Sequence, residues 1–121
     1  MGKRKPGKRK PGSITEYGSI SVVSGEPAEC VHHLIPGSGK RALADEDGLT
    51  VPLTHEEHNL AEKPEDRVHG NHMAEAFSRI AGQLAYEKKY YKEIAAGSAG
   101  LPGEEDPARE AFRDRYGMSY L

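Results

Sequence analysis

The histidines of this chain are gathered in one stretch. The 121 residues contain six histidines, and all of them lie between His32 and His72. Neutral imidazole is the commonest protein ligand of transition metals, and its charge changes most readily near neutral pH. This clustering indicates a metal site, an acid–base site, or both.

The spacing of the histidines predicts elements that bring them together. The adjacent His32 and His33 end a short segment at 28–33 that we expect to be a strand, and 49–53 is expected to pair with it. Thr54 and Glu57 have the capping-box spacing that begins a helix, and His58 lies in its first turns. One imidazole can then accept a proton from water while others hold a divalent ion, as phosphodiester hydrolysis requires.

These residues resemble the HNH (His-Me finger, ββα-metal) endonucleases, and most closely the small phage-type members. His-His-Leu-Ile at 32–35 is similar to the first motif of the family, and Leu-Thr-His-Glu-Glu-His at 53–58 to the second. The resemblance spans roughly residues 30–87. It implies that His33 is the general base and that His32 and His58 hold one divalent ion (Mg²⁺, Mn²⁺, Ni²⁺ or Zn²⁺). It also implies that the substrate is DNA.

The chain departs from the pattern of this family at three points. Thr54 and Glu57 stand where the second motif often has cysteines, so no secondary structural zinc is expected. The middle asparagine of the motif has no counterpart, and only Asp47 lies close enough along the chain to replace its orienting role. His69 and His72 follow the motif. His69 could complete the metal sphere or contact phosphate, and His72 could cap the long helix.

The cysteine content limits the kind of metal site. Cys30 is the single cysteine, which excludes an internal disulfide and a paired-cysteine zinc site within one chain. We expect Cys30 to be a small buried apolar residue and His55 to face solvent. A metal ion must therefore be held by histidine, carboxylate or water.

Charge is divided unevenly along the chain. The net charge is −2, but residues 1–12 carry six basic side chains and no acidic one, which leaves 17 − 6 = 11 basic and 19 acidic side chains elsewhere. Proline, glycine and like charges predict a disordered arm that binds nucleic acid by counterion release. Lys40 and Arg41, in an expected loop, are further candidates for phosphate contact. The basic residues of the arm are Lys3, Arg4, Lys5, Lys8, Arg9 and Lys10.

The remaining pattern predicts a small α+β domain. A ββα-metal finger is expected, with a third strand at 14–24, a turn at 45–48 and a short helix that ends before Pro64. A long helix over about 72–96 should direct an apolar stripe to the core, and a last helix should run from Asp106 to Gly117. The nuclease-like domain would cover 13–96, with a loop and C-terminal helix at 97–121. The stripe consists of Met73, Phe77, Ile80 and Leu84.

Several function classes are disfavoured, and three remain. No apolar run approaches the ~20 residues of a membrane span, and the N-terminus lacks the apolar segment of a signal peptide. We therefore expect a cytoplasmic protein, of bacterial or phage origin by resemblance, and favour a metal-dependent DNA endonuclease. The alternatives are a nucleic-acid-binding accessory protein of recombination or packaging with a degenerate or structural metal site, and a small assembly protein with a structural zinc. Oligomeric state and target specificity are left open.

Overall fold

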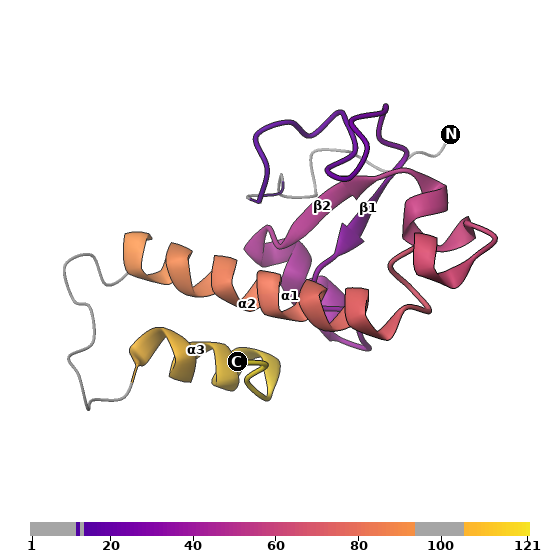
Figure 1. Cartoon of the computed structure of the whole chain (residues 1–121). Coiled ribbons are helices and arrows are strands. Elements are labelled where there is room, and N and C mark those ends of the chain that lie inside the picture. Colours follow the sequence, from indigo (N-terminus) through magenta and orange to yellow (C-terminus); the bar gives the residue numbers. More distant parts are fainter. Residues whose placement is uncertain (1–11, 13, 94–105) are drawn as a thin grey trace.

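The computed structural model describes residues 12, 14–93 and 106–121. It is a mixed α/β fold in which a two-stranded antiparallel hairpin is followed by helices. Figure 1 shows the hairpin and α1 on one side of the long helix α2, with α3 alongside α2. The expected arm, the end of the long helix and the following loop lie outside the described residues. The elements are β1 (Cys30–His33), α1 (Lys40–Asp47), β2 (Thr50–Leu53), η2 (Glu56–Leu60), η3 (Pro64–Asp66), α2 (His72–Glu93) and α3 (Pro107–Tyr116).

The hairpin is smaller than expected. β1 and β2 pair with His32 opposite Val51 and His33 opposite Thr50. The predicted strand at 14–24 is wrong, because the described part of that segment has only an isolated bridge between Ile20 and Pro27. The Ser21 hydroxyl accepts the N–H groups of the residues two and three positions on, which closes a local turn where a strand would need a ladder.

The connection between the strands is a helix. Lys40 and Arg41 were expected in a loop and residues 45–48 in a turn, and both predictions are wrong because α1 includes 40–47. Alanine, leucine and charged residues fill this segment, and all of them are compatible with a helix. Gly48 adopts a left-handed conformation at φ 74° and ends the helix, since its N–H bonds back to Ala44 and Asp45. The Asp-Glu-Asp-Gly sequence is therefore a helix end.

The core lies between the hairpin, α1 and α3. Ile35, Leu49 and Phe112 are fully buried in it, and Tyr116 is almost so. α3 begins and ends as expected, since the Asp106 carboxylate accepts the first free N–H groups and Gly117 closes the helix at φ 92°. The C-terminal helix therefore contributes to the same core as the hairpin.

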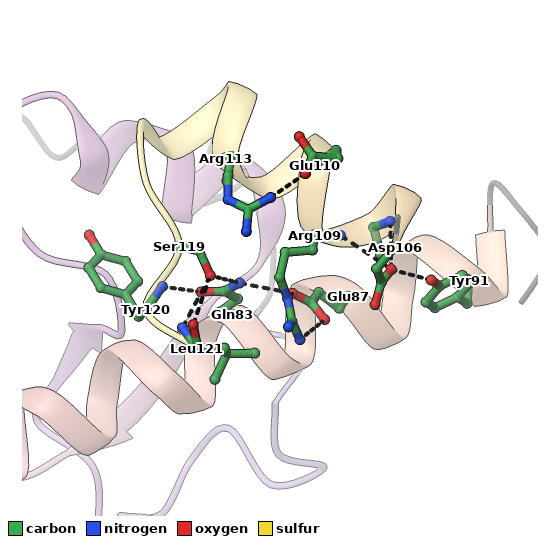
Figure 2. Close-up of polar contacts among 11 residues, drawn as sticks. Gln83, Glu87, Tyr91, Asp106, Arg109, Glu110, Arg113, Ser119, Tyr120 and Leu121 are labelled. Atoms are coloured by element: carbon green, nitrogen blue, oxygen red, sulfur yellow. Dashed lines mark hydrogen bonds and ion pairs between the residues drawn. The ribbon is translucent and has the colours of Figure 1, made fainter. Parts of the chain in front are cut away.

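Polar contacts join α3 and the residues after it to α2. Figure 2 shows Arg109 of α3 at the Glu87 carboxylate, with N···O distances of 3.0 and 3.2 Å. The buried Gln83 amide donates to the Ser119 hydroxyl at 3.0 Å and accepts the Tyr120 N–H at 2.7 Å. Each of these buried polar groups has a partner, so α2 can bury polar side chains without an unpaired donor or acceptor.

The predicted orientation of α2 is wrong. The stripe was expected in the core, but the side chains of Met73, Phe77 and Leu84 are 66%, 62% and 52% exposed. Its fourth member, Ile80, is half-buried. The helix instead buries Ser78, Gln83 and Glu87, whose polar groups have partners outside the helix. Gly82 is also buried, and a Cβ there would lie 2.9 Å from Ile35 Cγ1. The helical periodicity correctly identified an apolar stripe along the helix, but most of the stripe faces solvent and not the core.

We predict that Gly82→Ala lowers the free energy of unfolding. Its methyl group would clash with Ile35 and with Leu34 Cβ, at 2.9 and 3.1 Å. Overpacking of this kind costs about 1–3 kcal/mol, which exceeds the ~1 kcal/mol gained in helix propensity. Urea denaturation measures the difference. Gly18→Ala is the control, because its Cβ would meet nothing within 4 Å. Equal stability of the two variants would contradict the close approach of β1 to α2.

Candidate metal centre

Three histidines from separate elements meet at one point. His32 comes from β1, His58 from η2 and His69 from the loop before α2. Their ring centroids are 5.3, 5.2 and 4.7 Å apart, and one ligand nitrogen of each lies within 4.8 Å of the others. The structure therefore places His69 beside the two ligands that the sequence predicted.

Backbone pairing brings His69 to His58. The N–H groups of Val68 and His69 donate to the carbonyls of Glu57 and His58, at 2.8 and 3.1 Å. The Arg67 guanidinium donates to the carbonyls at both ends of the loop, those of Ala61 and His69, at 2.8 Å each. The loop is therefore held against η2 along its length.

The start of η2 matches the sequence prediction. The Thr54 N–H donates to Glu57 Oε1 at 2.9 Å, and the Glu57 N–H donates to Thr54 Oγ1 at 3.2 Å. This is the reciprocal pattern of a capping box. It begins the turn that directs His58 toward β1.

The hydrogen bonds of His32 assign its tautomer. Ser78 Oγ donates to the Leu34 carbonyl at 2.7 Å, so its single proton is used there. Ser78 Oγ must then accept from His32 Nε2, 2.9 Å away, which leaves a lone pair on His32 Nδ1. That nitrogen is buried and has no hydrogen-bond partner among the described residues. A buried nitrogen with a lone pair and no hydrogen-bond partner fits the role of a metal ligand.

The other two rings are oriented in the same way. His69 Nδ1 lies 3.4 Å from the Glu75 carboxylate and can only donate to it, and His58 Nδ1 lies 3.6 Å from Cys30 Sγ. The Cys30 thiol can itself donate to the Leu53 carbonyl at 3.6 Å. When the thiol donates there and His58 Nδ1–H donates to Sγ, the two Nε2 atoms face each other at 3.1 Å, each with a lone pair. Cys30 was expected to be a small buried apolar residue. It is instead half-buried, and its sulfur contacts the His58 ring.

The charge state of the rings suits a cation. Burial, followed by the neighbouring His69 and His58, lowers the pKa of His32 to about 3. Burial, followed by His69, also lowers the pKa of His58. A neutral imidazole has a lone pair that can bind a cation. Zn–N bonds of ~2.0–2.1 Å in a tetrahedron separate two ligand atoms by about 3.4 Å. The His58 and His69 Nε2 atoms are 3.1 Å apart, and the three ligand atoms all lie within 4.8 Å of one another. The group can therefore hold a metal ion.

His33 is paired with a carboxylate from α1. His33 Nε2 lies 2.9 Å from Asp45 Oδ1, and its side chain is 10% exposed. The carboxylate accepts the Nε2 proton, so Nδ1 is left to accept a proton from another group. The prediction that Asp47 orients His33 is wrong. Asp47 Oδ2 instead lies 2.7 Å from Arg115 Nε and from the Tyr116 hydroxyl. Side chains two positions apart in a helix point about 200° apart, so Asp47 faces away from the side on which Asp45 meets His33.

A pocket joins His33 to the three-histidine group. Its volume is about 280 Å³, and His33, Arg41, His58 and His69 line it together with Val31, Pro36 and Asn59. A wider pocket of about 640 Å³ adjoins it, where His33, Arg41 and Asp45 meet the turn at 37–39. The exposed Arg41 lines both pockets.

The other candidates from the sequence lie elsewhere. Lys40 lines neither pocket, and its Nζ lies 3.5 Å from the Tyr120 hydroxyl. His55 and His72 are exposed and outside the metal group, and Asn71 caps α2 in place of His72. The basic residues at 3–10 lie outside the described residues. Sequence reasoning missed Asp45, Ser78 and Glu75, whose spacing along the chain carries no motif.

A scan against models of protein families, a search of curated proteins and a search of solved structures each found no match to this chain. Among the described helices, none has the length and apolar character to cross a membrane. Function must therefore be inferred from the chemistry of the side chains.

We predict that Ser78→Ala weakens metal binding about 10–100-fold, because His32 loses the hydrogen bond that orients it and sets its tautomer. Competition with a chromophoric chelator for Zn²⁺ or Co²⁺ measures the affinity. Ser119→Ala is the matched control, since it removes one hydroxyl partner of α2 away from the histidines. Equal metal affinity in both variants would contradict this role for Ser78.

Proposed function

We propose that this protein is a metal-dependent endonuclease of the HNH type that hydrolyses DNA phosphodiester bonds. The observation that carries the proposal is a shared pocket. It brings His33, which is paired with Asp45, together with two histidines of the candidate metal group and with the exposed Arg41. A base, a Lewis-acid site and a phosphate-binding cation are the three groups that hydrolysis of a phosphodiester needs.

His33 is the proposed general base. Its Nδ1 accepts a proton from the attacking water, while Nε2–H remains hydrogen-bonded to Asp45. The carboxylate holds the ring in one tautomer and stabilises the imidazolium that forms when the proton is taken. Asp45 therefore positions the base without touching the phosphate.

His32, His58 and His69 are the proposed metal ligands. Three imidazole nitrogens favour Zn²⁺ or Ni²⁺ over Mg²⁺ and Mn²⁺, which are better suited to oxygen ligands. A bound ion would polarise the scissile phosphate and stabilise the leaving 3′-oxygen. Three protein ligands leave a coordination position for substrate, whereas a structural zinc normally has four.

Phosphate contacts come from two places in this proposal. Arg41 lines the pocket beside His33 and can donate to a phosphate oxygen of the substrate. The six basic side chains within residues 3–10 supply affinity that is sensitive to salt and independent of sequence. Lys40 has no part in the site, because it lies against Tyr120.

We predict that His33→Ala abolishes metal-dependent nicking of supercoiled plasmid but leaves metal affinity and DNA binding intact. The imidazole takes the water proton and, in this proposal, is not a metal ligand, so loss of a general base should cost about 10²–10⁴ in rate. Plasmid nicking assays with Zn²⁺, Ni²⁺, Mn²⁺ and Mg²⁺ make the measurement. His55→Ala is the control, because that histidine is exposed and outside the group.

Other results would favour the alternatives. No cutting by the wild type with any ion, together with a salt-sensitive gel shift, would favour a nucleic-acid-binding accessory protein. Unfolding of the wild type by a chelator, with no activity at any metal loading, would favour a structural ion. Normal cutting by His33→Ala would reject His33 as the base.

Asp45→Asn should slow nicking at least tenfold, by less than His33→Ala, while metal affinity stays unchanged. The amide keeps the shape of the side chain but cannot stabilise the imidazolium as a carboxylate does, and general-base catalysis as a whole is worth about 10²–10⁴. Single-turnover rates with saturating metal separate the chemical step from binding. Asp66→Asn, an exposed carboxylate on η3, is the control. A full rate in Asp45→Asn would remove Asp45 from the mechanism.

A further inference from the structure

The outer face of α2 is apolar. Met73, Phe77 and Leu84 are 66%, 62% and 52% exposed, and Ala76 and Ala81 are exposed beside them. At about 100° per residue, Met73, Phe77 and Leu84 point away from the face that contains Ser78 and Gly82. Ala81 lies at the edge of the apolar face. The solvent side of a helix that packs on a core is normally charged or polar. Here Met73, Phe77 and Leu84 face solvent instead.

The spacing of this face fits a second helix. Met73, Phe77, Ile80 and Leu84 follow one another at intervals of four, three and four residues. This alternation is the seam of a helix pair, in which each side chain inserts between side chains of the facing helix. Contiguous exposed apolar patches of this kind mark interaction surfaces. We name these four residues, of which Ile80 is half-buried, the α2 seam.

We propose that the α2 seam binds the same seam of a second copy of this chain. The two helices run antiparallel about a two-fold axis near Ile80 and Ala81. In this arrangement Phe77 of each copy packs against Leu84 of the other. Met73 packs along the aliphatic part of Lys88, whose ammonium group reaches solvent.

Charge complementarity argues for a second copy in this orientation. The segment 62–66 at the N-terminal end of α2 has three exposed acids, Glu62, Glu65 and Asp66, against one lysine. Asn71 ties this segment to the helix, since its Nδ2 donates to the Glu65 carbonyl at 3.5 Å. The C-terminal end of α2 carries the exposed Lys88 and Lys92. Antiparallel pairing brings the acidic end of each copy beside the basic end of the other, whereas parallel pairing would bring like charges together.

The two segments outside the described residues have few large apolar side chains with which to cover the seam. Residues 1–11 contain one large apolar side chain, Met1, and residues 94–105 contain two, Ile94 and Leu101. Neither segment has a row of apolar side chains to match four seam positions. The proposal is independent of the proposed nuclease activity, because the seam lies on the opposite face of α2 from Ser78 and His32.

Sedimentation equilibrium of the full chain over a wide concentration range tests the pairing. The wild type should reach twice the chain mass of 13.2 kDa. Phe77→Glu combined with Leu84→Glu should stay at the single-chain mass, because it sets carboxylates against one another in the seam. Val23→Glu is the matched control, since Val23 is 69% exposed but lies outside α2, and it should dimerise like the wild type. Circular dichroism checks that the fold is retained.

A cysteine placed near the axis tests the orientation. Ala81→Cys should form a disulfide-linked dimer on mild oxidation, because the two copies of this position lie close together in an antiparallel pair. Ser24→Cys, at an exposed site away from α2, should not. A wild type that is monomeric at every concentration would overturn the proposal. So would a dimer that survives the double substitution, or no selective crosslink at position 81.

Discussion

One hydrogen-bond chain underlies the candidate site and the packing around it. The Leu34 carbonyl accepts from Ser78, and Ser78 accepts from His32, so the end of β1 is joined to the middle of α2. The same contact sets which nitrogen of His32 carries the lone pair. It requires β1 and α2 to lie very close, and Gly82 allows this because it has no side chain to meet Ile35. A buried unpaired nitrogen is costly, and a bound ion would remove that cost.

α1 links the candidate site to the C-terminal helix. Its Asp45 carboxylate lies at His33, while Asp47, on another face, binds Arg115 and the Tyr116 hydroxyl. Burial, followed by the hydrogen bond to Asp47, raises the pKa of Tyr116, so this phenol stays protonated. α3 therefore stabilises the helix that carries the proposed positioning residue. A substitution in α3 that weakens its contacts with Asp47 would shift α1 and, with it, the Asp45 carboxylate at His33.

The two faces of α2 differ in polarity. The inner face buries polar side chains, and each has a specific partner: Ser78 at His32, Gln83 at the C-terminal segment and Glu87 at Arg109. The outer face has apolar side chains and few charges. This division is the reverse of an ordinary surface helix, and it becomes favourable if a second helix covers the outer face. The two faces then have separate roles, one in supporting the histidines and one in association.

The sequence by itself determined the features that depend on near neighbours. The capping box at Thr54, the strand with paired histidines and both ends of the last helix follow from residues a few positions apart. Only the tertiary structure decided which carboxylate reaches His33, that His69 joins the metal group, and which face of α2 is buried. His33 and Asp45 are 12 residues apart, and His32 and Ser78 are 46 apart. Contacts at such separations are set by how helices pack, and periodicity cannot tell a core stripe from an association stripe.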